Sequence, residues 1–80
     1  MRIHVDNLSS EVTEQELREI FEKYGQVSHA MIAEIGQTRR GEVDMPLDRQ
    51  GFDAIEDLNG KEIKGQKVDV HKTALTETFI

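Results

Sequence analysis

Apolar and polar residues follow two different periods along the chain, and these periods predict its elements. In residues 3–6 apolar and polar positions alternate, which is typical of a strand with one buried face. Residues 13–24 repeat apolar side chains at helical spacing, which places them on one face of a helix. Those side chains are Leu17, Ile20, Phe21 and Tyr24. Thr13 and Glu16 predict a capping box at the start of this helix, and Gly25 is expected to end it.

A long hairpin is predicted to follow the first helix. Residues 27–35 form its first strand, residues 36–39 its loop, and residues 41–45 its returning strand. Pro46 cannot donate a backbone hydrogen bond, so the returning strand is expected to end there. These two strands are the second and third of the predicted sheet.

The second helix is predicted from the residues around its start and from one apolar stripe. Asp48 is the expected N-cap, with Leu47 and Phe52 forming a hydrophobic staple. The stripe consists of Gly51, Ala54, Ile55 and Leu58. Small residues in it let the helix lie close to a sheet, and residues 59–60 are expected to end it.

The last elements are a short hairpin through Lys64 and Gly65 and a fourth strand over residues 68–71. The resulting order is βαββαβ. Two right-handed crossovers then predict an α+β, ferredoxin-like sandwich, with a four-stranded antiparallel sheet of order 4-1-3-2 and both helices on one face. We assign residues 1–73 to this domain and residues 74–80 to a C-terminal tail. Chain ends are usually mobile, so a frayed tail is the first expectation, and docking of its apolar residues on the sheet or on another chain is the alternative.

Composition narrows the function classes. With 80 residues the chain fits one domain, and without cysteine it forms neither disulfides nor thiolate metal sites. The longest apolar run, residues 30–33, is far short of the roughly 20 residues that span a bilayer, so no membrane partner is predicted. We expect a cytoplasmic protein, or a nuclear one if the domain belongs to a larger eukaryotic chain. The net charge of −6 disfavours a polyanion at long range.

Several separate patches resemble the RNA recognition motif family. Residues 3–8 read Ile-His-Val-Asp-Asn-Leu and are similar to the hexapeptide motif of that family, with His4 in place of an aromatic residue. Residues 17–25 and 54–60 resemble its two helices, and Gly65 lies where its last hairpin has glycine. The resemblance implies the same fold and the binding of single-stranded RNA on the open sheet face.

The octapeptide motif of that family falls on residues 40–47, where Arg40 and Gly41 match the pattern. The two positions that carry stacking aromatics in the family hold Glu42 and Asp44. With His4, these residues form the position-by-position equivalent of the family's stacking platform. Because stacking contributes about 1 to 3 kcal/mol per base, we expect weak or non-standard RNA binding.

We therefore predict an RNA-binding domain that uses its sheet face and rim. The predicted contact residues are Arg2, His4, Asn7, Met31, Arg39, Arg40, Glu42, Asp44, His71 and Lys72. The alternative is a protein-interaction domain that reuses the fold with its stacking surface replaced, and meets its partner through the sheet face or the tail.

Neither catalysis nor a metal is favoured by the sequence. No motif places a nucleophile beside a base, and no glycine-rich loop suits a phosphate, so we predict no enzyme and no cofactor. Strand alternation puts three histidines and four carboxylates on the open face: His4, His29, His71, Asp6, Glu42, Asp44 and Asp69. A divalent metal site is conceivable there, but without tight ligand spacing ordinary surface ion pairs are favoured, and we predict no metal.

Overall fold

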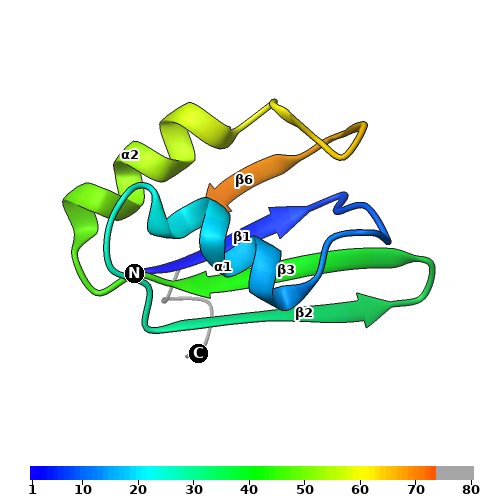
Figure 1. Ribbon diagram of the computed structural model, residues 1–80, viewed down its shortest axis with the longest axis horizontal. Coiled ribbons are helices and arrows are strands. Elements are labelled where there is room, and N and C mark those ends of the chain that lie inside the picture. The colour runs from blue at the N-terminus through cyan, green and yellow to red at the C-terminus, as the bar shows by residue number, and fades with distance from the viewer. Residues whose placement is uncertain (74–80) are drawn as a thin grey trace, which may run out of the picture.

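The computed structural model describes residues 1–73, and in that part of the chain two helices cover one face of a four-stranded antiparallel sheet (Figure 1). The elements are β1 (Arg2–Asp6), α1 (Glu14–Glu22), β2 (His29–Ile35), β3 (Thr38–Asp44), α2 (Asp48–Leu58), β4 (Glu62–Ile63), β5 (Gln66–Lys67) and β6 (Asp69–Lys72). The sheet order is β2-β3-β1-β6, which confirms the predicted order 4-1-3-2 read from the opposite edge. The predicted docking of the tail concerns residues 74–80, which lie outside the described residues.

The core lies between the helices and the sheet. Ile3 and Val5 of the central strand β1 are fully buried, together with Leu17 and Phe21 of α1. Since side chains alternate along a strand, burial of these positions turns the residues between them to the open side of the sheet. Gly41 of β3 allows α1 to approach, because a Cβ there would lie 2.8 Å from a methyl carbon of Leu17.

The predicted capping box at the start of α1 is confirmed. The Thr13 hydroxyl accepts a hydrogen bond from the Glu16 backbone N–H at 3.1 Å, and the Glu16 carboxylate accepts one from the Thr13 backbone N–H at 3.0 Å. The Lys64 ammonium lies 2.8 Å from the same carboxylate. This ammonium, followed by the Thr13 backbone, holds the pKa of Glu16 below its usual value. The contact ties the β4–β5 hairpin to α1.

Two local predictions are wrong. The β2–β3 loop contains only Gly36 and Gln37, not residues 36–39, because Thr38 pairs with Ile35 and begins β3. Gly36 has a φ of 63°, which suits glycine in so tight a turn. The shorter loop makes Arg39 a strand residue.

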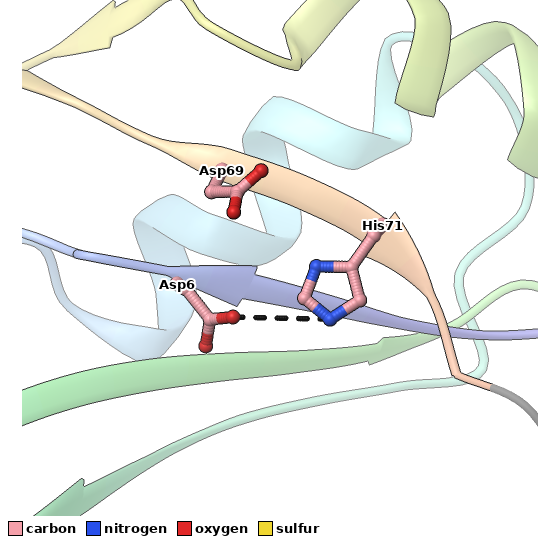
Figure 2. A group of neighbouring side chains, drawn as sticks. All are labelled: Asp6, Asp69 and His71. Carbon is pink, nitrogen blue, oxygen red and sulfur yellow. Dashed lines mark ion pairs between the residues drawn. The ribbon is translucent and has the colours of Figure 1, made fainter.

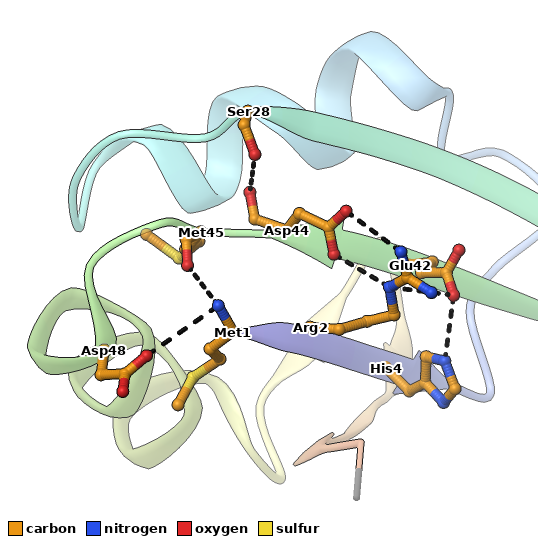
Figure 3. A network of polar contacts seen from close by, with 8 residues as sticks. All are labelled: Met1, Arg2, His4, Ser28, Glu42, Asp44, Met45 and Asp48. Carbon is orange, nitrogen blue, oxygen red and sulfur yellow. Dashed lines mark hydrogen bonds and ion pairs between the residues drawn. The ribbon is translucent and has the colours of Figure 1, made fainter. Parts of the chain in front are cut away.

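The predicted start of α2 is wrong as well. Leu47 is the N-cap and makes no side-chain hydrogen bond, and Asp48 is the first helical residue. The carboxylate of Asp48 lies 3.9 Å from the Met1 ammonium (Figure 3). Leu47 and Phe52 are each 52% exposed, so the proposed staple adds little to the core. The predicted stripe is confirmed at Gly51, Ala54 and Leu58, which are buried, and at the partly buried Ile55.

On each outer strand of the sheet, a backbone N–H donates a hydrogen bond to a side-chain oxygen. On β2 the Ile32 N–H donates to the Glu14 carboxylate at 2.9 Å, and on β6 the Val70 N–H donates to the Asn59 side-chain oxygen at 2.9 Å. Because these N–H groups are already bonded, they hinder the addition of a further strand at the sheet edge. The sheet surface opposite the helices is therefore the broader candidate for ligand contact.

Candidate nucleic-acid interface

The strand register arranges the outward side chains of the sheet in three rows. The first row contains His29, Asp44 and Arg2; the second contains Met31, Glu42, His4 and His71; the third contains Ala33, Arg40, Asp6 and Asp69. We call these residues the open face. All seven predicted histidines and carboxylates lie on it, as do seven of the ten predicted contact residues: Arg2, His4, Met31, Arg40, Glu42, Asp44 and His71.

Arg2 lies between the two carboxylates at the platform positions (Figure 3). Its Nε is 3.0 Å from Asp44 Oδ1 and 3.6 Å from Glu42 Oε2. The hydrogen bond to Asp44, aided by both negative charges, raises the pKa of Arg2 above its ordinary value. An arginine from the neighbouring strand thus offsets one of the two negative charges that replace the aromatic residues.

The His4 ring is held between its cross-strand neighbours. Its Nε2 lies 3.3 Å from Glu42 Oε2, and its ring meets that of His71 edge to face, with centroids 5.9 Å apart. The His4 side chain is only 17% exposed, whereas that of His71 is 45% exposed. Of these two rings, His71 offers the larger surface to a ligand, although the family pattern singles out His4.

A second ionic group is centred on Asp6, and Figure 2 shows Asp69 and His71 beside it. Arg40 Nε lies 2.6 Å from Asp6 Oδ1, and His71 Nε2 lies 3.8 Å from Asp6 Oδ2. Asp69 completes a trio with Asp6 and His71 in which one potential ligand atom per residue lies within 4.8 Å of the others. The arginine competes with any cation for Asp6.

We expect this trio not to bind zinc at micromolar concentration, since Asp6 is already paired with Arg40 and the site offers one imidazole. Titration of the protein with zinc while histidine side-chain NMR signals are recorded will test this. A His71 shift at micromolar zinc that disappears in the Asp69→Asn variant would contradict the expectation, and His29, outside the trio, provides the internal control.

Arg39 was predicted as a rim contact, but the structure places it away from the open face. Its Nη1 donates hydrogen bonds to the backbone carbonyls of Ser9 at 2.5 Å and Val12 at 2.9 Å. Its Nε pairs with Glu34 at 3.1 Å. Arg39 therefore holds the segment that leads into α1, which is a structural task.

Two further predicted residues also lie off the open face. Lys72 pairs in register with the buried Ile3, and its ammonium lies 5.7 Å from the ring centroid of Phe52 on α2. Asn7 follows β1 with a φ of 65°, and its side-chain amide donates to the Lys67 carbonyl at 2.8 Å. Lys72 thus contacts the helix layer, and Asn7 contacts the final hairpin.

The sequence prediction missed a hollow of about 360 Å³ where β1 ends beside the β2–β3 turn. We call it the hairpin hollow, and its lining residues are Asp6, Asn7, Ile35, Thr38, Arg39 and Arg40. Ile35 is 59% exposed there. Strand alternation with Ala33 could have placed Ile35 on the open face, but the overlong predicted loop hid its pairing with Thr38.

The described residues 1–73 form a βαββαβ sandwich whose sheet has helices on one face and none on the other. Domains of this class present the sheet to their ligand. The family model described as the RNA recognition motif matches residues 3–69, and the chain belongs to this family. The family is an RNA-binding fold without enzymatic activity. Within residues 1–73, neither helix has the length and apolar character needed to cross a bilayer.

Relatives and solved structures agree with this assignment. One relative is the "Polyadenylate-binding protein, cytoplasmic and nuclear" of Chaetomium globosum, to which the chain is 37% identical over 71 residues. The aligned residues make up 85% of this chain and 9% of that protein. It is 40% identical over 76 residues to the putative RNA-binding protein RbpB of Nostoc sp., 90% of this chain and 74% of that one. The structure of RNA binding protein PG1 is 34% identical with a TM-score of 0.81, covering 94% of each chain. The Mip6 RRM3 domain, 24% identical with a TM-score of 0.80 over 88% of each chain, shares the fold.

Proposed function

We propose that this chain binds single-stranded RNA on its open face, weakly, and more through cationic groups than through stacked rings. Membership of the family supports RNA as the ligand, as do the names of the relatives at 40% and 34% identity. The observation that carries the mode of binding is the pairing of the outward carboxylates with Arg2 and Arg40.

Unpaired carboxylates at the platform positions would repel RNA phosphates. Here Glu42 and Asp44 share Arg2, and Asp6 pairs with Arg40. Both arginine side chains remain partly exposed, so their planar guanidinium groups can stack on bases or donate to phosphate oxygens. The face thus keeps cationic contacts although its formal charge is negative.

The open face has few groups that bind RNA strongly, and this limits its affinity for RNA. Two missing rings remove about 1 to 3 kcal/mol of stacking per base. Two arginines that contact phosphates predict a slope of about −1.4 in log affinity against log salt concentration, at about −0.7 per contact on a single strand. We therefore propose weak binding with a shallow salt dependence.

Fluorescence anisotropy with labelled RNA octamers, homopolymeric and of mixed sequence, tests this proposal. We expect binding at low salt that the Arg2→Gln substitution weakens several-fold, with the salt slope reduced by about 0.7. Arg49→Gln is the matched control, because Arg49 is exposed on α2 and away from the open face. It should leave both affinity and slope unchanged.

If no octamer binds at low salt, RNA binding is excluded and the protein-interaction alternative replaces it. Equal losses for Arg2→Gln and Arg49→Gln would instead indicate attraction by overall charge and contradict a site on the open face. Because the chain spans 9% of the polyadenylate-binding protein, we propose for it the RNA contact of one domain, with the cytoplasm as the expected compartment.

A further inference from the structure

The hairpin hollow contains an exposed apolar side chain, Ile35, and an arginine, Arg40, that donates only part of its hydrogen bonds within residues 1–73. Ile35, the last residue of β2, is 59% exposed, an unusual degree for a large aliphatic residue beside a sheet. The hollow measures about 360 Å³. That size lies near the lower end of ligand pockets, about 300 to 1,000 Å³, and suits one nucleotide better than a longer segment.

The hydrogen-bonding groups of the hollow are unequally engaged. Arg40 donates through Nε to Asp6, and within residues 1–73 its terminal amino groups have no acceptor. The Thr38 hydroxyl donates to the Ile35 carbonyl at 2.8 Å, which leaves its oxygen able to accept a hydrogen bond. By contrast, the Asn7 amide and the Arg39 guanidinium are bound to backbone carbonyls. Arg40 and Thr38 are therefore the polar groups available to a ligand.

Charge is similar at the two ends of the open face. With histidines neutral, Arg2 faces Glu42 and Asp44 at one end, and Arg40 faces Asp6 and Asp69 at the other, an excess of one negative charge at each end. The exposed Ile35 side chain and the free amino groups of Arg40 therefore distinguish the hollow, and charge does not.

We propose that the hairpin hollow is a nucleotide subsite for single-stranded RNA. The base packs on Ile35, the terminal amino groups of Arg40 donate to a phosphate oxygen or a base acceptor, and Thr38 accepts from a base amine or the ribose 2′-hydroxyl. This inference rests on the proposed function and names the place where the strand is held outside the platform positions.

The test compares two exposed apolar residues on opposite sides of the molecule. We expect Ile35→Ala to weaken the binding of an RNA octamer by about three- to tenfold, because burial of the isoleucine against a base is lost. Phe52→Ala is the matched control, since Phe52 is similarly exposed, at 52%, on α2. It should bind within twofold of the wild type, and thermal unfolding will verify that both variants fold.

Two further readouts locate the site. Arg40→Met should reduce the salt slope by about 0.7, and the Ile35 methyl NMR signals should shift on RNA addition. If the wild type binds RNA but Ile35→Ala and Phe52→Ala both bind like it, the hollow is not the subsite and the proposed function stands. If the wild type binds no RNA octamer, the proposed function and the subsite fail together.

Discussion

Replacing Glu42 and Asp44 together with phenylalanine is expected to tighten RNA binding by about 30-fold or more. Each restored ring adds about 1 to 3 kcal/mol of stacking on one base, and 1.4 kcal/mol corresponds to a factor of ten. The same change frees Arg2 from its two carboxylate partners, 3.0 and 3.6 Å away, for contact with phosphate. Anisotropy titrations of wild type and double variant at one salt concentration measure the gain.

A matched control separates stacking from charge. The variant Glu42→Gln with Asp44→Asn removes the same two charges without adding rings, so it should gain less than tenfold and show a steeper salt dependence than wild type. Equal gains in the two double variants would mean that charge alone limits binding. If neither gains affinity, the platform positions do not contact RNA.

The sequence predicted the fold because its local signals agree with each other. The period of Leu17 and Phe21, the capping box at Thr13 and the alternation around Val5 all specify elements that the structure contains. The family resemblance added the positions of the platform. Each of these signals depends on residues that are close in the sequence, within about one helical turn or a few strand residues.

The ionic pairing of the open face could not be predicted in the same way. Arg2 and Asp44 are 42 residues apart and meet only because β1 pairs with β3 in one particular register. The sequence showed two carboxylates at stacking positions and suggested an acidic platform. The structure adds the arginine from the neighbouring strand, which changes the expected effect of those carboxylates on a phosphate.

The wrong bounds of the predicted β2–β3 loop led to a wrong predicted position for Arg39 but not for Arg40. With Arg39 at the end of the predicted loop and Arg40 directly after it, both side chains could reach the rim, and both were predicted as RNA contacts. In strand β3 they must point to opposite faces. Arg39 then contacts the backbone before α1, with its side chain 18% exposed, and Arg40 contacts Asp6 on the open face.

This difference predicts opposite effects for two adjacent substitutions. Arg39→Met should lower the free energy of unfolding by about 2 to 3 kcal/mol, because it removes the charged donor to the Ser9 and Val12 carbonyls. For a domain of this size the melting temperature should fall by roughly 10 to 20 °C. Since the Arg39 guanidinium is bound to backbone carbonyls, RNA affinity of the folded Arg39→Met variant should fall less than that of Arg40→Met. Arg40→Met should change stability by less than about 1 kcal/mol, as expected for an exposed pair, and weaken RNA binding.

Urea denaturation and anisotropy at a temperature where both variants are folded measure the two effects. Glu34→Gln is the control for the ion pair of Arg39: since Glu34 is largely exposed, its loss should cost less than about 1 kcal/mol and show that the backbone carbonyls carry the stabilisation. An Arg39→Met variant as stable as wild type but impaired in RNA binding would reverse the assignment. Arg39 would then contact the RNA, and its contacts in front of α1 would contribute little to folding.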